Sequence, residues 1–418
     1  MKKNIWIFHH YATPPTMSGL TRPYEFSKQL KDKGYNCTVF SSAYLHYTGE
    51  NLISNGRKYI VHKDSEVPFV FVRTSEYKGN GLSRVLNMFS FAYNLFSVTK
   101  EIIKKQGKPD VIYASSPHPL TMVAGILISK KLGIPCVCEI RDLWPEAIFA
   151  VGKAQENSIL GRLLIKGEHW IYKNADALVF LKEGDTDYLR ERKWTLEQGG
   201  DIDLNKCYYI NNGVDIEAFN KQVNEIKIED EDLNDNSFRV VYAGSIRAVN
   251  NVGKILDAAK LLKENEDIKF LIYGTGNELD LLKTRVKDEN LTNVKLKGYV
   301  NKKYIPYILS KSSVNILNYS PSQYNWTRGN SSNKLFEYMA SGKPIISTVK
   351  MGYCILEKYQ CGFSLKNSTP EELAKAILKI YNMPKEQYNE LCYNAAKGAK
   401  YFDYKILTEK LIKVIENV

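Results

Sequence analysis

Short β-rich runs alternate with helical patterns along most of the chain, and this alternation restricts the folds that the sequence can adopt. The first block starts with NIWIFHH and continues with DVIYASS, PCVCEIRD and ADALVF, each followed by a helical pattern. The pattern restarts after residue 205 with CYYINNGV, and FRVVYAGS, IKFLIYGTG and SVNILNYS follow in the same way. Such alternation indicates βαβ units and parallel sheets. The sequence therefore predicts an α/β protein with two doubly wound domains.

A polar segment without periodicity, residues 193–205, separates the two blocks. We therefore expect an N-terminal domain over residues 1–205 and a second domain over residues 206–398. From residue 370 onward three helical patterns follow one another without a strand. The last of them, residues 399–418, is expected to pack across both domains.

Composition and the lack of long apolar runs exclude several classes of protein. With 418 residues and 44% hydrophobic side chains, the chain can bury the cores of two domains. Residues 85–98 come nearest to a membrane span, but they contain Asn and Ser and fall short of the roughly 18 apolar residues that a span needs. The first residues lack the apolar core of a signal peptide, and the cysteines form no C-x-x-C pair. We expect a cytoplasmic protein with reduced thiols, which can also lie at the inner face of the cell membrane.

Positive charge is concentrated at the start of the chain. Residues 1–110 hold 16 of the Lys and Arg residues against 8 Asp and Glu, within a net charge of +12. An anionic lipid surface or a phosphorylated substrate fits this surplus, whereas no nucleic-acid-binding module is recognisable. Residues 82–106 combine aromatic and aliphatic side chains with Arg84, Lys100, Lys104 and Lys105. They suit an interfacial helix beside anionic lipid, although an ordinary buried helix explains the same apolar face.

The loops after the strands are the places to search for a ligand site, because open parallel sheets bind ligands beyond the carboxyl ends of their strands. Gly19 precedes a helix that starts near Thr21, where the backbone can approach an anion; a plain turn capped by Thr21 is the alternative. Gly274 and Gly276 join a strand to a helix in YGTGNELDLL. The third glycine of a dinucleotide fingerprint falls at Leu279, so a dehydrogenase loses its main support.

The stretch SSNKLFEYMASGKPIIS predicts a short helix with an anion site at its amino end. Ser331 or Ser332 can cap the helix. The N–H groups of the next three residues, Asn333, Lys334 and Leu335, then point outward, with the charge of Lys334 beside them. This combination suits a diphosphate.

Glu337 lies further along the same predicted helix. At 1.5 Å per residue it is about 6 Å beyond the amino end, where a carboxylate can accept hydrogen bonds from a ribose diol. Phosphates at the helix tip and ribose one turn further on describe a nucleoside diphosphate. The alternative is a surface glutamate that pairs with nearby lysines.

These motifs together resemble those of the family 4 glycosyltransferases of the GT-B fold. The resemblance covers nearly the whole chain, through IFHHYATPPTMSGLTRPYEFSKQL, EIRDLWPE, INNGVDIEAF, VYAGSI, YGTGNELDLL and SNKLFEYMASGKPII. The chain is most similar to bacterial enzymes of surface polysaccharide assembly, for O-antigen or capsule, in which RDLWPE and SNKLFEYMASGKP occur together. The resemblance implies two Rossmann-like domains that face across a cleft, with a C-terminal helix that crosses back to the first domain.

The resemblance also implies roles for residues of the donor site. Gly19 is expected near the donor phosphates, and Gly274 in the same donor-binding set. Glu337 matches the ribose-binding glutamate of the family. The backbone at Tyr299 and Val300 is expected to hold the nucleobase.

Candidate residues for the reaction itself lie in the first domain. His118 in ASSPHPL and Arg141 and Asp142 in EIRD follow successive predicted strands. In the family this region contacts the transferred sugar, which makes His118 the best candidate for the reaction centre. A structural histidine is the alternative.

Two departures from the family pattern bear on the donor. The first glutamate of the E-x7-E motif is replaced by Gly329, which removes or reassigns one contact to the sugar. The usual Arg and Lys of the phosphate loop are replaced by Ser245 and Asn250. Arg247 or Lys334 is expected to supply the charge instead.

By this resemblance the chain transfers a sugar with retention of configuration and without a bound metal or other cofactor. UDP is the expected nucleotide, an N-acetylated hexosamine or its deoxy derivative the expected sugar, and a lipid-linked saccharide the expected acceptor. The triplets Asp185–Asp187 and Asp201–Asp203 fall in a helix start and a loop, so we expect no metal there. A nucleotide-sugar epimerase of the same fold and a non-catalytic nucleotide-sugar binding protein are the alternatives.

Overall fold

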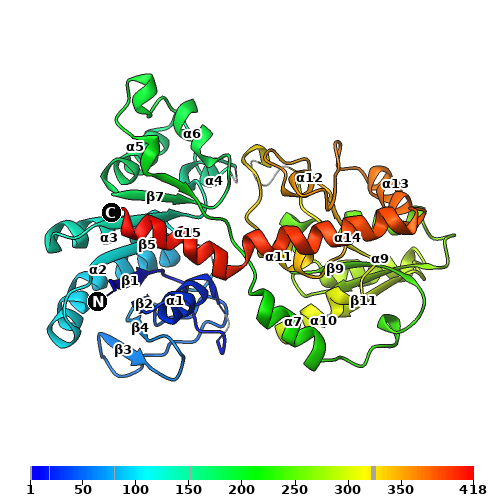
Figure 1. Cartoon of the computed structure of the whole chain (residues 1–418), viewed down its shortest axis with the longest axis horizontal. Helices are drawn as coiled ribbons and strands as arrows, with labels where there is room; N and C mark the ends of the chain where they lie inside the picture. The colour runs from blue at the N-terminus through cyan, green and yellow to red at the C-terminus, as the bar shows by residue number, and fades with distance from the viewer. Residues whose placement is uncertain (1, 18, 80, 151, 322–325) are drawn as a thin grey trace. The chain divides into compact units, whose positions relative to one another are not determined.

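The computed structural model describes residues 2–17, 19–79, 81–150, 152–321 and 326–418 (Figure 1). The chain divides into two compact units. Unit 1 comprises Met1–Asn211 and Leu407–Val418, and unit 2 comprises Asn212–Ile406. The domain limits at 205 and 398 stay a prediction about independent folding, which expression of the separate halves can test.

Unit 1 is built on a sheet of eight strands in the order β3-β4-β2-β1-β5-β6-β7-β8. The strands are β1 (Asn4–Phe8), β2 (Asn36–Ser42), β3 (Tyr59–His62), β4 (Phe69–Val72), β5 (Val111–Ser116), β6 (Cys136–Ile140), β7 (Ala177–Phe180) and β8 (Cys207–Tyr209). All neighbours are parallel except β3 and β4, which form an antiparallel edge. All residues of β4, β5, β6 and β7 are buried, as is typical of parallel strands that are covered on both faces.

In the described part of unit 1, the α-helices before β8 are α1 (Arg22–Asp32), α2 (Leu82–Gln106), α3 (Pro119–Leu132), α4 (Trp144–Ala150), α5 (Ile159–Asn174) and α6 (Asp185–Glu191). Local sequence explains where two of them begin or end. Ser158 caps α5, because its side chain accepts a hydrogen bond from the N–H of Gly161 at 3.0 Å. Gly133 ends α3 in the left-handed conformation, with φ of 61°. Among the described residues no helix combines the length and the apolar character needed to cross a bilayer.

Unit 2 contains a six-stranded sheet in the order β11-β10-β9-β12-β13-β14, in which every pair is parallel. The strands are β9 (Phe238–Ala243), β10 (Ile268–Tyr273), β11 (Val294–Gly298), β12 (Val314–Leu317), β13 (Ile345–Ser347) and β14 (Gly362–Ser364). Successive residues of a strand face opposite sides of the sheet. Val240 and Tyr242 of β9 accordingly belong to one core cluster, and Val241 and Ala243 belong to another.

The remaining helices are α7 (Ile216–Glu225), α8 (Gly253–Leu261), α9 (Leu279–Asp288), α10 (Ile305–Ser310), α11 (Asn333–Ala340), α12 (Ile355–Lys358), α13 (Pro370–Tyr381), α14 (Lys385–Ala399) and α15 (Tyr404–Glu416). The end of α15 packs on unit 1, where Lys3 Nζ donates to the carbonyl of Ile415 at 2.6 Å and Tyr35 donates to Glu416 at 2.7 Å. These contacts confirm that the C-terminal helix returns to the first domain. The two parallel α/β sheets confirm the predicted fold class.

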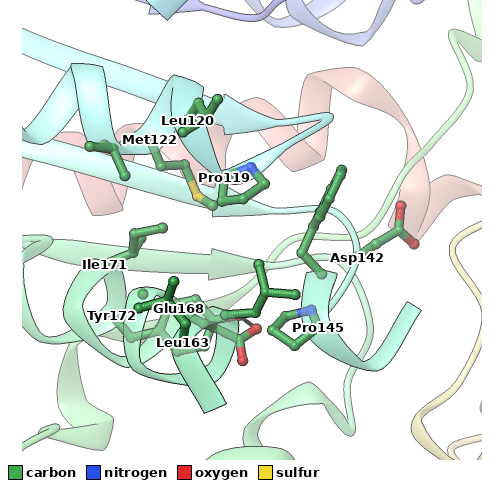
Figure 2. Close-up of a pocket in the computed structure, with 13 residues that line it drawn as sticks. Pro119, Leu120, Met122, Asp142, Pro145, Leu163, Glu168, Ile171 and Tyr172 are labelled. Atoms are coloured by element: carbon green, nitrogen blue, oxygen red, sulfur yellow. Dashed lines mark hydrogen bonds between the residues drawn. The ribbon is translucent and has the colours of Figure 1, made fainter. Parts of the chain in front are cut away.

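A cavity of about 170 Å³ opens in unit 1 between the start of α3, the helix α4 and the helix α5 (Figure 2). Figure 2 shows Pro119, Leu120 and Met122 on one side of it and Leu163 and Ile171 on the other. Most of its lining side chains are apolar. The lining of the cavity is therefore suited to contact with a hydrocarbon group.

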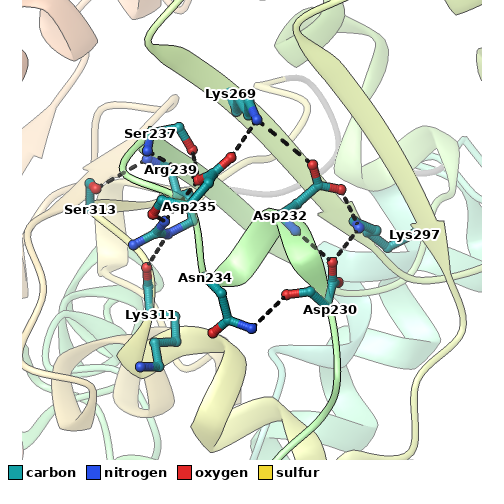
Figure 3. Close-up of polar contacts among 10 residues, drawn as sticks. All are labelled: Asp230, Asp232, Asn234, Asp235, Ser237, Arg239, Lys269, Lys297, Lys311 and Ser313. Carbon is teal, nitrogen blue, oxygen red and sulfur yellow. Dashed lines mark hydrogen bonds and ion pairs between the residues drawn. The ribbon is translucent and has the colours of Figure 1, made fainter.

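A network of charged side chains stabilises the start of the second sheet (Figure 3). Lys297 of β11 contacts Asp230 at 2.7 Å and Asp232 at 2.5 Å, while Lys269 of β10 contacts Asp232 at 3.9 Å and also pairs with Asp235. The network ties the loop before β9 to two neighbouring strands. Its members are partly exposed, so we expect a modest contribution to stability.

Candidate functional site

In unit 2 the carboxyl ends of β9, β10 and β11 meet through glycines. The N–H of Gly274 donates to the carbonyl of Gly298 at 2.7 Å, and the N–H of Gly244 donates to Tyr273 at 2.9 Å. Gly274 has φ of 147°, and a Cβ there would lie 1.8 Å from the carbonyl oxygen of Gly244. Only glycine fits this contact. The three strand ends therefore form one closely packed edge that includes two of the predicted positions, Gly274 and the segment after Gly298.

Lys334 reaches this edge from the first turn of α11. Its Nζ lies 4.9 Å from the ring centre of Tyr242 and 4.7 Å from that of Tyr319. It also lies 3.3 Å from both the Tyr242 hydroxyl and Asn250 Oδ1. Burial, aided by the positive charge of Arg247, lowers the pKa of Lys334 to about 7, although Glu337 acts in the opposite direction. At neutral pH the Lys334 side chain is therefore present in both its charged and its neutral form.

The two positions that depart from the family pattern are joined by hydrogen bonds. Asn250 Nδ2 donates to the carbonyl of Ser245 at 2.8 Å and to its hydroxyl at 2.7 Å. Arg247 Nε donates to the same hydroxyl at 3.2 Å. Because Asn250 also contacts Lys334, this Ser245–Asn250 pair links both expected replacement cations. This link was not predicted from the sequence.

The amino end of α11 lies where it was predicted, but the expected serine cap is wrong for Ser332. Ser332 occupies the N-cap position with extended backbone, and its side chain makes no cap hydrogen bond. Instead, its N–H donates to Asn330 Oδ1 at 2.7 Å, and its carbonyl accepts from the N–H of Leu335 at 3.1 Å. The helix therefore begins at Asn333 through backbone geometry.

Glu337 lies one turn into α11, and its side chain is 23% exposed. Burial raises its pKa, while Lys302 and Lys334 act in the opposite direction. Lys302, whose side chain is exposed, approaches Glu337 Oε1 to 3.8 Å. The pairing with a lysine that the sequence left open is therefore present, through a residue that was not a candidate. After β11, Tyr299 is exposed.

In unit 1, His118 is the N-cap residue of α3 and is fully buried. Its Nε2 lies 2.6 Å from Nδ1 of His10, which is also fully buried and was not a sequence candidate. Burial lowers the pKa of His118 to about 3 and lowers that of His10 well below its ordinary value. Both rings are therefore neutral near pH 7. His118 can exchange a hydrogen bond with a ligand, but it cannot act there as a cationic acid.

Two polar atoms of the candidate residues in unit 1 lack hydrogen-bond partners among the described residues. They are Nδ1 of His118 and Nη1 of Arg141, both of which are buried. Buried polar atoms are normally paired, so an exception calls for an explanation. Ligand contacts at these atoms are one explanation. Asp142, by contrast, is exposed, and its carboxylate points away from the apolar side chains in Figure 2.

Glu139, the second-last residue of β6, is a buried carboxylate that accepts three hydrogen bonds from side chains. It accepts hydrogen bonds from Arg22 Nε at 2.7 Å, from the Tyr113 hydroxyl at 2.6 Å and from the Ser115 hydroxyl at 2.6 Å. Arg141 Nη1 lies 3.8 Å away. Burial alone raises its pKa, but the two arginines and two hydroxyls outweigh this and hold the pKa at about 2. Glu139 is therefore ionised throughout the physiological range.

Gly19 lies in the loop before α1, away from the glycines of unit 2 in the sequence. A Cβ at this position would lie 2.3 Å from Oγ1 of Thr13, so the loop requires glycine there. Thr21 is the N-cap residue of α1, but its side chain makes no cap hydrogen bond, so the alternative of a threonine cap is wrong. The structure explains Gly19 by packing, and its role toward donor phosphates stays a prediction.

Residues of both Asp-x-Asp triplets make contacts within the protein, and Asp201 lies 2.8 Å from His169 Nε2 and 2.8 Å from Lys173 Nζ. Asp185 begins α6 and lies 3.4 Å from Lys182, and Asp203 accepts a hydrogen bond from the N–H of Asn205 at 2.9 Å. Among the described residues no group of three His, Cys, Asp or Glu side chains could hold a metal ion.

Two family descriptions match the chain. "Glycosyl transferase 4-like domain" matches residues 21–197, and "Glycosyl transferases group 1" matches residues 223–398. Among known proteins, the probable glycosyltransferase WbjE of Pseudomonas aeruginosa is 23% identical over 322 residues, which is 75% of each chain.

Solved structures with the same fold cover the whole chain. HepE of Anabaena in complex with UDP superposes with a TM-score of 0.67 and 14% identity, over 100% of both chains. WaaG, a glycosyltransferase involved in lipopolysaccharide biosynthesis, superposes with a TM-score of 0.63 and 12% identity, over 99% of this chain and 100% of WaaG.

Because the ion pair of Glu139 is buried, we expect its loss to cost much more unfolding free energy than the loss of an exposed ion pair. In Glu139→Gln the charge of Arg22 stays buried without its counter-charge, and we expect unit 1 to lose about 3–5 kcal/mol of unfolding free energy. Hydrogen exchange at the amides of β5 and β6, measured against urea concentration, reports this unit separately. The matched control is Glu156→Gln, which removes the surface pair with Arg192 and is expected to cost less than about 1 kcal/mol. Equal losses in the two variants would contradict the importance of the buried network.

Proposed function

The chain belongs to the family 4 glycosyltransferases of the GT-B fold, and from that premise we propose that it transfers a sugar from a UDP-sugar to a lipid-linked saccharide. The observation that carries the donor assignment is the position of Lys334. Its ammonium lies at the packed edge of β9 and β10, in the first turn of α11 and one turn before Glu337. This arrangement supports a diphosphate beside a ribose.

Two cations and a helix end favour diphosphate at this edge. Lys334 and Arg247 both contact the Ser245–Asn250 pair, so their charges are held near the amino end of α11. The N–H groups of Asn333 and Lys334 add the positive end of the helix dipole, whereas the N–H of Leu335 already donates to the Ser332 carbonyl. Preorganised donors of this kind stabilise the charge that develops on a departing diphosphate. We therefore assign the phosphate-binding role to Lys334 and Arg247 together.

The ribose is assigned to Glu337 and the nucleobase to the backbone at Tyr299 and Val300. A partly exposed carboxylate can accept two hydrogen bonds from a ribose diol. Lys302 Nζ lies 3.8 Å from Glu337 Oε1, and because the Lys302 side chain is exposed, it can move away from the carboxylate when the ribose binds. The solved structure of HepE with UDP supports a nucleotide in this class of fold.

The transferred sugar is assigned to unit 1. Neutral His118, with an unpartnered buried Nδ1, suits a hydrogen bond to a sugar hydroxyl, and Arg141 and Asp142 are the neighbouring candidates. Gly19 is assigned to the phosphates by family likeness. The acceptor hydroxyl attacks the anomeric carbon on the face that the diphosphate leaves, and its proton passes to a donor phosphate oxygen. The new C–O bond forms as the bond to the phosphate breaks, with retention and without a protein nucleophile or metal.

The acceptor and sugar are proposed from likeness. Similarity to WbjE and to WaaG, which acts in lipopolysaccharide biosynthesis, supports a role in bacterial surface polysaccharide assembly. An N-acetylated hexosamine or its deoxy derivative is the proposed sugar. The proposed location is the cytoplasm, at the inner face of the cell membrane.

A panel of UDP-, GDP- and dTDP-sugars, with and without lipid-linked acceptor, tests the proposed reaction. We expect one UDP-sugar to release UDP, with the sugar recovered on the acceptor. In Glu337→Ala we expect the net loss of at least one charged hydrogen bond, worth about 1.5–3 kcal/mol, which corresponds to a loss of at least about 10- to 160-fold in kcat/KM. The matched control is Glu386→Ala, an exposed glutamate in the first turn of α14. Sugar conversion without an acceptor would instead indicate an epimerase, and binding without consumption would indicate a binding protein.

The low pKa of Lys334 predicts that UDP affinity depends on pH. The diphosphate binds the charged form of Lys334, whose pKa in the free protein is about 7, so affinity falls as pH rises above 7. The UDP phosphate is already ionised there, because its last pKa is about 6. We expect the dissociation constant to rise by up to about tenfold per unit between pH 7 and 9. The Lys334→Arg variant keeps its positive charge over this pH range. The dissociation constant of UDP, measured by calorimetry, should therefore change less with pH in this variant than in the wild type; equal changes would contradict the assignment.

The long helix α2 supports a membrane contact for unit 1. It buries one face, which includes Met88, Phe91 and Leu95, and this part agrees with an ordinary core helix. A second face exposes Leu82, Leu86, Phe89 and Tyr93, each to more than half. Their spacing of four, three and four residues lines one side of a helix. With Lys100, Lys104 and Lys105 further along the helix, this face suits the surface of an anionic membrane.

Flotation with liposomes that contain anionic lipid tests this contact. We expect wild-type protein to float, and the triple variant Leu86→Ser, Phe89→Ser and Tyr93→Ser to lose binding at least about tenfold, because each large apolar side chain contributes about 1.5–3 kcal/mol when buried. Charge reversal of the three lysines should also abolish flotation. The control exchanges equally exposed side chains of unit 2, namely Leu261, Leu281 and Tyr393, for serine. Unchanged flotation of the α2 variants would contradict the proposed membrane contact.

A further inference from the structure

The cavity of unit 1 has the size and lining of a hydrocarbon site. Its volume of about 170 Å³ is close to the roughly 150 Å³ of an engineered apolar cavity that binds benzene. Proline, leucine, valine, isoleucine and methionine side chains form most of its wall, together with Trp144. A group of about five or six carbons fits such a space.

Glu168 lies in this wall, but its oxygens are taken up by the protein. Oε1 accepts a hydrogen bond from the Tyr172 hydroxyl at 2.7 Å, and Oε2 accepts one from the Tyr188 hydroxyl at 2.6 Å. Burial raises the pKa of Glu168 to about 7. Because both oxygens already have donors, an occupant needs no polar group at this wall. This favours a hydrocarbon occupant over a cationic one.

The apolar surface continues from the cavity to the outside of α5. Leu163 lines the cavity and is more than half exposed, and Ile159 and Leu160 in the turn before it are also more than half exposed. Arg162 and Lys166, both exposed, lie on the same stretch of helix. Exposed apolar side chains with basic residues between them suit a lipid that carries a negative charge next to its hydrocarbon chain.

The cavity adjoins the residues assigned to the transferred sugar. Pro119 lines it and directly follows His118, and Asp142 lines it and directly follows Arg141. Trp144 Nε1 donates to the carbonyl of Pro117 at 3.1 Å, which holds α4 against the end of β5. A lipid whose chain enters the cavity therefore has its head group close to the proposed reaction centre.

We propose that this cavity holds the part of the acceptor lipid's hydrocarbon chain that lies next to its phosphate, with Arg162 and Lys166 beside the phosphate. The proposal rests on the proposed glycosyltransferase function, since it names where the lipid of that acceptor binds. It concerns unit 1 alone and is separate from the exposed face of α2.

Gly167 allows a clean test, because it lines the cavity from the middle of α5. A Cβ added there meets no atom within 4 Å, so a side chain can extend without a clash. Replacing a glycine inside a helix also favours the helix. Gly167→Phe therefore fills the space while the fold is kept, and Gly167→Ala is the matched control that leaves it open. Thermal unfolding of the two variants checks that both are folded.

The probe is farnesyl phosphate with a diazirine on the five-carbon unit next to the phosphate, since one such unit matches the volume of the cavity. After irradiation of the full-length protein, mass spectrometry should find label on residues 119–123 and 163–172 in wild type and Gly167→Ala. We expect labelling to fall at least about tenfold in Gly167→Phe, because the aromatic ring takes up the apolar space in which several methylene groups of the probe would be buried. Arg162→Glu with Lys166→Glu should weaken labelling by the phosphate but not by farnesol carrying the same diazirine.

Binding of UDP, measured on the same samples, separates this proposal from the proposed function. Equal labelling of Gly167→Phe and Gly167→Ala, or a wild-type protein that binds UDP but takes no label in these segments, would overturn the lipid site alone. A protein that takes the label here but neither binds UDP nor transfers sugar would overturn the proposed function and leave the cavity as a lipid site.

Discussion

The arrangement of unit 1 depends on the hydrogen bonds and ion pairs of the buried Glu139 carboxylate. The carboxylate receives donors from α1 through Arg22 and from β5 through Tyr113 and Ser115. Arg22 also donates to the carbonyls of Ile210 and Asn211, the last residues before unit 2 begins. Removing a charge from water is costly, and only a full set of donors offsets that cost. One carboxylate thereby ties the first helix, two central strands and the chain leaving the unit into a single network.

The same carboxylate affects the candidate residues indirectly. Burial, aided by the positive charge of Arg141, lowers the pKa of His9 to about 3, while the charge of Glu139, 3.8 Å from Arg141, acts in the opposite direction. His118 and His10 are likewise neutral, so the polar floor of this site is made of uncharged rings beside one ion-pair network. Such a floor suits hydrogen bonds to sugar hydroxyls. In the proposed function, stabilisation of the diphosphate charge is assigned to Lys334 and Arg247 of unit 2.

Periodicity and loop composition were sufficient to predict both parallel sheets, the helix from Asn333 and the glycine-rich strand ends. They missed the antiparallel edge of β3 and β4 and every contact that joins distant parts of the chain. His10 and His118 are 108 residues apart, and Arg22 and Glu139 are 117 apart, so no local pattern reveals either pair. The link between Ser245, Asn250 and Lys334 was hidden for the same reason. For residues 82–106 the sequence left an interfacial and a buried helix open, and only the packing of α2 shows which of its faces is covered.

The most direct test of the donor assignment is a crystal structure of the protein with bound UDP. The donor assignment predicts diphosphate oxygens within hydrogen-bond distance of Lys334 Nζ and of the N–H groups at the start of α11. It also predicts the ribose hydroxyls on Glu337, with Lys302 displaced from that carboxylate. UDP bound elsewhere, or bound with Lys334 still enclosed by Tyr242 and Tyr319 and out of reach of the phosphates, would contradict it.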